Sequence, residues 1–130
     1  MAPQVFSSFS LNGEEDFDPD AFTAATGLMP SRSWRKGEEA RGRLRQHSSW
    51  SLAIGPDLTF DHCKQVERLL DLIEPHADAI RELRNGHGVE PQIGLSWGDL
   101  DGDESTPGFH FSVELLRRIV ALGADLDCDV

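Results

Sequence analysis

QVFSSFSL, residues 4–11, is the stretch that decides the fold class of this chain of 130 residues. Successive side chains of a strand point to opposite faces, so one face carries Val5, Ser7, Phe9 and Leu11 and the other carries Phe6, Ser8 and Ser10. This alternation predicts a strand that is buried on one side. Asn12-Gly13 follows and is expected to turn the chain.

Period-two patterns recur along the chain and predict further strands at 31–37, 48–54, 88–97, 108–112 and 124–130. Pro91 lies inside one of these runs, which indicates an edge strand or a late strand start. The polar link between the strands at 31–37 and 48–54 contains Gly42, and we expect a mobile loop there. Gly55-Pro56-Asp57 is expected to end the second of these two strands.

Apolar stripes with helical spacing lie between the strands, the longest running from Phe60 to Ile73. Pro75 is expected to open a second segment of this long helix. Residues with capping chemistry mark the expected helix ends, namely the N-caps Asp18, Thr59 and Ser112 and the terminating glycines Gly27, Gly86 and Gly123.

The resulting order is β-α-β-β-α-β-β-α-β, which predicts an α+β fold with helices packed on one face of a mostly antiparallel sheet. The length suits a single domain, residues 1–130. No apolar run approaches the roughly 20 residues that span a bilayer, and no secretory pattern is present. Cys63 and Cys128 sit in apolar patterns, so we expect reduced, buried thiols and a cytoplasmic protein.

The formal net charge of −11 argues against nucleic-acid binding, because phosphate recognition needs a basic surface. Within this acidic chain, residues 32–45 hold six bases and only two acids. We expect this basic strip to pair with carboxylates of the chain itself.

GLSWGDLDGDES, residues 94–105, matches two functional motifs in part. Its first letters fit the G-x-S-x-G elbow of serine hydrolases, but that elbow requires a helix directly after the serine. Ser96 is followed instead by a run of acids, and its alternation with Leu95 and Trp97 predicts an ordinary strand position. We therefore expect no catalytic serine here.

The acids that follow resemble the start of a calcium loop. An EF-hand loop counted from Asp99 needs Gly at its sixth position and Glu at its twelfth, where this chain has Glu104 and His110. A solvated acidic loop is the better interpretation, and an irregular divalent site stays an alternative. This loop displays Asp99, Asp101, Asp103 and Glu104.

Asp125, Asp127 and Asp129 alternate with apolar residues and share one face of the predicted last strand. Three like charges in a row repel each other unless a cation lies opposite. Three interpretations are open: pairing across the sheet with Arg32 or Arg35, solvation near the C-terminus, or contact with a basic partner or a metal.

Trp34 and Trp50 lie on predicted neighbouring strands, where they are expected to anchor the core. The alternative is a ligand platform with Arg32 or Arg35 stacked on an indole. The histidines show no metal-binding spacing, Cys63 lies on an apolar stripe, and no phosphate-binding glycine loop is present. We expect no catalytic residues, no metal and no cofactor.

Several spaced segments carry a resemblance to a known family: Asp18-Pro19-Asp20, Pro30, residues 33–37 (SWRKG), Trp50 and residues 122–127 (LGADLD). In these the chain resembles the small bacterial domain-of-unknown-function family 4279, over nearly its whole length. The resemblance implies a compact cytosolic α+β domain. It brings no established activity, so no catalytic residue is carried over.

Together these observations predict a non-enzymatic binding protein, an immunity-type or regulatory partner of a basic protein. Its acidic surface is expected at residues 99–104 and 125–129. The alternative is a small-molecule-binding protein or enzyme whose pocket contains Trp34, Arg35, Lys36 and His110, with Trp50 beside them. No nucleic-acid or membrane partner is expected.

Overall fold

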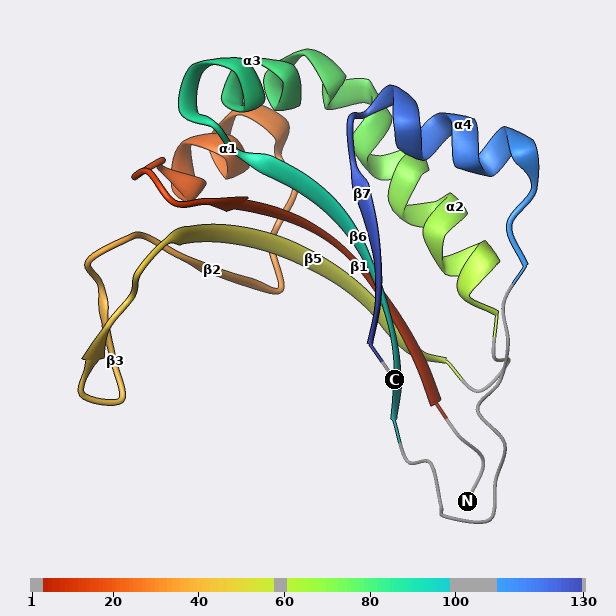
Figure 1. The fold of residues 1–130 in the computed structure, drawn as a ribbon, viewed down its shortest axis with the longest axis horizontal. Helices are drawn as coiled ribbons and strands as arrows, with labels where there is room; N and C mark the ends of the chain where they lie inside the picture. The colour runs from red at the N-terminus through yellow and green to blue at the C-terminus, as the bar shows by residue number, and fades with distance from the viewer. Residues whose placement is uncertain (1–3, 58–60, 99–109, 130) are drawn as a thin grey trace.

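A computed structural model describes residues 4–57, 61–98 and 110–129. Figure 1 shows an arched sheet with the helices α2, α3 and α4 along the outer, convex side of the arch. The strand order is β2-β5-β1-β6-β7, and all pairs are antiparallel except β6 with β7. The predicted α+β class with a mostly antiparallel sheet is therefore confirmed.

The strands are β1 (Gln4–Gly13), β2 (Arg32–Trp34), β3 (Glu39–Ala40), β4 (Arg43–Leu44), β5 (Ser48–Asp57), β6 (Glu90–Gly98) and β7 (Asp125–Asp129). The helices are α1 (Pro19–Thr26), α2 (His62–Ile73), α3 (Ala77–His87) and α4 (Val113–Ala121), and the 3-10 turn η1 (Glu74–His76) joins α2 to α3.

The core lies between the convex face of the sheet and the helices. β1 contributes Val5, Phe9 and Leu11, each fully buried as the alternation at residues 4–11 predicts. Trp50 from β5 and Ile93 from β6 lie on the same face and are also fully buried. The helices cover this face because their apolar stripes face it.

The first helix forms where its capping residues predict it. The Asp18 side chain accepts a hydrogen bond from the Asp20 amide, and Pro19 occupies the first helical position. Gly27 ends the helix in the left-handed conformation, with φ of 74°. The last helix likewise begins at Ser112, whose hydroxyl accepts from the Leu115 amide.

Several element boundaries differ from the predicted ones. α3 continues through Gly86 to His87 and ends instead at Gly88, whose φ of 63° is left-handed. The second helix is capped by Asp61 instead of Thr59, which lies outside the described residues, as does Phe60. β5 continues through Gly55 to Asp57, because Gly55 has φ of +119° and the register with β1 shifts between Val5 and Ser7. The strand therefore does not end at Gly55 as predicted; a β-bulge forms there and the strand continues beyond it.

Three predicted segments take another form. The link predicted to be a mobile loop contains the hairpin β3–β4. Residues 110–112 are not a strand, and they lead into α4. β6 is an inner strand, not an edge, and Pro91 fits because pairing with β7 begins one residue later, at Gln92.

Candidate functional site

The described helices leave the concave face of the sheet uncovered (Figure 1). The residues on this face are mainly polar. The strand registers place one set of mainly small polar side chains on this face, Ser8, Ser10, Asn12, Ser49, Ser51, Gln92 and Ser96, together with Glu90, Asp125 and Asp127 toward β7 and Arg32 and Trp34 on β2. This face is the candidate functional site because all of these polar residues except the buried Ser49 are at least partly exposed.

Opposite charges lie at the two edges of this face. The registers put Arg32 of β2 and Asp125 of β7 at the two ends of a single cross-strand row, separated by Ser51, Ser10 and Gln92. Four strand spacings of about 4.8 Å separate them by roughly 19 Å. Pairing of Asp125 or Asp127 with Arg32 across the sheet, one of the three interpretations above, is therefore wrong.

Trp34 forms the centre of the basic edge. The Arg45 guanidinium lies 4.1 Å from its ring centroid and that of Arg32 lies 5.2 Å away, while His47 meets the ring edge-on at 5.7 Å. The stacking of Arg32 on Trp34 agrees with the ligand-platform alternative of the sequence analysis. The sequence analysis did not predict the contribution of Arg45. Arg45 reaches the indole because the hairpin folds back, with its amide donating to the Glu38 carbonyl.

Arg35 lies apart from that platform and is held by a carboxylate. Its Nη2 and Nε donate to the two oxygens of Asp16 at 2.7 and 3.2 Å, a bidentate ion pair. The hydrogen bond from Arg35 is the main cause that lowers the pKa of Asp16 from its ordinary value, and one from Ser48 adds to it. Internal pairing thus accounts for this member of the basic strip.

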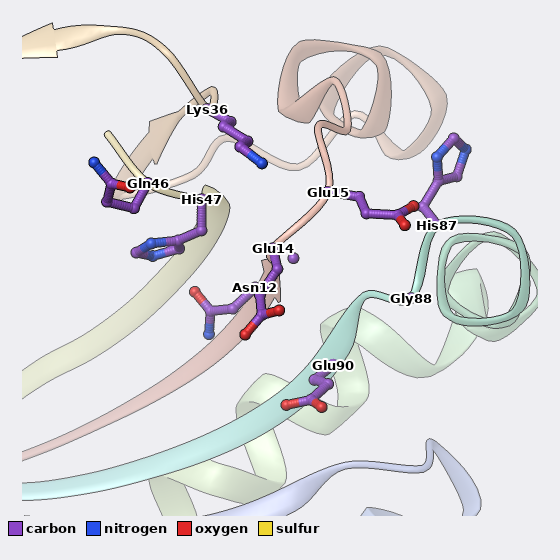
Figure 2. A pocket seen from close by; sticks show the side chains of 10 residues that line it. Asn12, Glu14, Glu15, Lys36, Gln46, His47, His87, Gly88 and Glu90 are labelled. Carbon is purple, nitrogen blue, oxygen red and sulfur yellow. The ribbon is translucent and has the colours of Figure 1, made fainter. Parts of the chain in front are cut away.

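A cavity of about 820 Å³ opens at the end of the concave face where β5 and β6 begin. Figure 2 shows Glu14 and Glu90 close to Asn12, with Gln46 and His47 on one side and Glu15 and His87 on the other. Glu14, Glu15 and Glu90 form no ion pair within residues 4–57, 61–98 and 110–129. Sequence analysis missed this cavity because four separate segments form it.

The predicted small-molecule pocket is not assembled from the predicted residues. Lys36 lines the 820 Å³ cavity, whereas Arg35 does not and Trp34 stacks with Arg32 and Arg45. His110 is exposed and precedes α4, which Figure 1 places far from β2.

Trp50 cannot belong to a ligand site, because it is fully buried on the convex side. Its ring packs edge-on against Phe9 and Phe22, and its Nε1 donates to Thr23 Oγ1 at 3.0 Å. The expectation that Trp50 anchors the core describes its position correctly. The same expectation is wrong for Trp34, which is half-buried on the concave face and lies outside the core.

The acidic residues of the predicted partner surface fall in two groups. Asp99, Asp101, Asp103 and Glu104 lie outside the described residues. Asp125 and Asp127 are exposed on β7, the strand to which Asp129 also belongs. The last strand therefore carries the acidic surface that the structure describes.

The thiols differ in exposure. Both cysteines are free; Cys63 is half-buried on α2 and Cys128 is exposed on β7. The expectation of two buried thiols is therefore wrong for Cys128, because β7 lies at the edge of the sheet. Burial raises the pKa of the Cys63 thiol, and the neighbouring Glu67 carboxylate raises it further.

Ser96 lies inside β6, as its alternation with Leu95 and Trp97 predicts, and its carbonyl oxygen is 3.0 Å from Nε2 of the buried His62. In the described part of the chain, no three His, Cys, Asp or Glu side chains are grouped so as to hold a metal ion. None of the described helices is long and apolar enough to cross a membrane.

Residues 3–130 match the profile of a family described as "Domain of unknown function (DUF4279)". The chain belongs to this family. Nearly the whole chain is covered, so the match includes both the basic edge at β2 and the acidic edge at β7 of the DUF4279 fold described above. No curated protein matches the chain, and no solved structure matches it either.

Proposed function

We propose that this DUF4279 protein is a non-enzymatic binding protein that engages a basic protein partner, as an immunity or regulatory protein does. The supporting observation is the state of Asp125 and Asp127. Both are exposed at the edge of the sheet, and within the described ranges neither forms an ion pair or a side-chain hydrogen bond. The formal charge of −11 adds long-range attraction toward a cationic partner.

The surface beside Asp127 has room for a basic side chain. A hollow of about 280 Å³ lies there, lined by Ser8, Ser10, Gln92, Gly94, Leu95, Ser96 and Asp127. Gly94 leaves space in the hollow because it has no side chain. A Cβ at this position would lie only 2.8 Å from Ser8 Oγ, which also lines the hollow. A lysine or arginine of the partner would donate to the Asp127 carboxylate and to the serine hydroxyls in this hollow.

Further carboxylates extend this surface toward the large cavity. Glu90 lies on the same face as Asp125, and both line a hollow of about 360 Å³ that also contains Arg84. Glu14 and Glu15 lie beyond Glu90, around the 820 Å³ cavity. Glu14, Glu15, Glu90, Asp125 and Asp127 therefore line neighbouring hollows of the concave face, where they could contact more than one basic residue of a partner.

The test is affinity capture from a lysate of the source cells, followed by quantitative mass spectrometry. We expect the wild-type protein to enrich one or more proteins of high isoelectric point at low salt. The Asp125→Asn and Asp127→Asn double variant is expected to lose this enrichment, because the carboxylates that contact the partner are gone.

A matched control carries the same change in charge elsewhere. The exposed carboxylates of Asp78 and Glu82 lie on α3, on the convex side, and the Asp78→Asn and Glu82→Gln double variant should retain the partner. Equal loss in both variants would show that capture depends only on net charge. Absence of any basic protein from the wild-type sample would contradict the proposal.

A small polar ligand in the 820 Å³ cavity is a second candidate function. The volume lies within the range of about 300–1,000 Å³ that is typical of ligand sites, and Lys36 and His47 share the cavity with Glu14 and Glu90. A ligand that carries both an amine and a carboxylate fits these charges. Free amino acids should raise the Tm of the wild type and not of a Glu90→Gln variant; unchanged Tm values would exclude this function.

A further inference from the structure

β7 ends the sheet. It pairs with β6 on its inner side, and no strand of the described residues pairs with its outer side. The outer backbone N–H and C=O groups of such an edge strand are available to a strand from another chain.

The two faces of β7 differ in chemistry. Asp125 and Asp127 lie on the concave face, whereas Leu126 and Cys128 lie on the helix side, in register with the buried Ile93 and Leu95 of β6. Leu126 is nevertheless 39% exposed, and Cys128 is exposed. β7 therefore presents carboxylates on one face and uncovered apolar groups on the other.

The rotation of α4 about its axis is fixed by one arginine. Arg118 donates to both carboxylate oxygens of Glu74 and to Asp71, at distances of 2.6 to 3.2 Å. Asp71 belongs to α2 and Glu74 begins the following turn, so Arg118 marks the side of α4 that faces α2. Leu115 and Ile119 of α4 are buried toward the core.

This rotation leaves an apolar stripe on the other side of α4. Val113, Leu116 and Val120 are 59%, 41% and 72% exposed. Successive residues of a helix are rotated by about 100° around its axis, so the buried Leu115 and Ile119 lie between Arg118 and this stripe. The stripe is therefore on the side of α4 away from α2. α2 packs over β1 and β5, whereas α4 contacts β7 and leads directly into it (Figure 1). The stripe thus lies on the side of α4 that faces away from α2, toward the β7 end of the strand order.

A second copy of this chain does not fit that space by pairing its own β7. An antiparallel β7–β7 pair centred on Leu126 would set Asp125 of each copy against Asp127 of the other. Like charges directly opposite each other destabilise a strand pair. Basic residues at alternate positions of an added strand would instead complement Asp125 and Asp127.

We infer that the outer edge of β7 is a strand-addition site for a partner segment in which lysine or arginine alternates with apolar residues. The basic residues pair with Asp125 and Asp127 on the concave face. The apolar residues lie against Leu126 and beneath the stripe of Val113, Leu116 and Val120. This inference rests on the proposed function and adds to it the form and the residue pattern of the bound segment.

The experiment uses fluorescently labelled peptides and the full-length protein in anisotropy titrations at low salt. One peptide contains Lys-Val-Lys-Val-Lys between glycines, and a second has the same composition with its three lysines adjacent. We expect the alternating peptide to bind at least about tenfold more tightly, because only it satisfies the edge hydrogen bonds, the aspartates and the apolar stripe together.

Two backbone-methylated peptides test the hydrogen bonds directly. In one the valine amides are N-methylated, in the other the lysine amides. Since alternate amides of a strand point in opposite directions, only one set faces β7. One methylated peptide should therefore lose about tenfold or more in affinity and the other should bind like the parent.

Protein variants locate the site. Val120→Asn, at a largely exposed position, should weaken the alternating peptide several-fold and leave the block peptide unchanged. Asp127→Asn should weaken the alternating peptide, whereas the control Glu82→Gln should not. Equal affinity of the alternating peptide and the peptide with adjacent lysines would overturn strand addition. Equal affinity of both methylated peptides and the parent would overturn it too. In either case the binding of a basic partner would remain supported. Failure of every lysine peptide to bind would count against both proposals.

Discussion

The indole of Trp50 meets the ring of Phe22 edge to face, with ring centroids 4.8 Å apart and planes inclined by 73°. The contact joins α1 to the centre of the sheet, where Phe9 packs against the same indole. Trp50→Ala should lower the free energy of unfolding by about 3–5 kcal/mol, because it empties a fully buried site. Chemical denaturation measures this loss. Trp34→Ala, at the half-buried edge, should cost clearly less, and equal costs would contradict the assignment of Trp50 to the core.

Gly55 is expected to resist substitution. Its φ of +119° is unfavourable for other residues, and a Cβ there would lie 2.7 Å from the Val5 carbonyl oxygen. Gly55→Ala should therefore destabilise the protein by about 1–3 kcal/mol. Gly86→Ala on α3, where a Cβ meets nothing within 4 Å, should stabilise it by about 0.5–1 kcal/mol. Thermal melting of both variants checks the opposite signs; shifts of the same sign would argue against the bulge.

The ion pair of Asp16 with Arg35 predicts a pH dependence. Because the pKa of Asp16 is lowered in the folded protein, its carboxylate stabilises the fold above the ordinary pKa of 3.8, and that contribution is lost as the pH falls through the lowered pKa. Asp16→Asn should thus be less stable than wild type at pH 7, with the difference vanishing at acid pH. Both side chains are about half exposed, so added salt should also shrink it. Urea titrations between pH 2 and pH 7 measure the effect, and a difference independent of pH would contradict it.

The two thiols should react at different rates. Burial raises the pKa of Cys63 and so reduces its thiolate, whereas Cys128 is exposed at the sheet edge. At pH 8, iodoacetamide should modify Cys128 first, as followed by mass spectrometry of digested protein. Glu67→Gln should accelerate the reaction of Cys63, because it removes the nearby carboxylate that opposes thiolate formation. Faster reaction of Cys63 than of Cys128 in the wild type would refute this order.

Local chemistry made much of this fold predictable. The alternation in residues 4–11 identified the buried face of β1, and Asp18 and Gly27 marked both ends of α1. These signals depend on backbone geometry and on neighbours a few residues away, so one sequence contains them. The rule that proline cannot donate a backbone hydrogen bond within a sheet also applies at Pro91, because pairing of β6 with β7 starts only at Gln92.

The arrangement of the site was less predictable because it depends on strand order. Whether Asp125 lies beside Arg32 or across the sheet from it follows from pairings between distant segments, which periodicity does not encode. Likewise, Arg45 stacks on Trp34 only because the hairpin β3–β4 folds back toward β2. The exposure of Leu116 and Val120 on α4 likewise depends on the contact between Arg118 and Glu74, which lies 44 residues earlier in the chain.

The separation of Arg32 from Asp125 gives the molecule an electric dipole directed across its strands. In the field of that dipole, the proposed basic partner would be rotated before first contact, so that its basic segment would arrive at the β7 end. At 0.1 M salt the Debye length is about 10 Å, shorter than the roughly 19 Å between the two charges, and this orientation largely disappears. Association rates should consequently fall with ionic strength more steeply than dissociation rates rise.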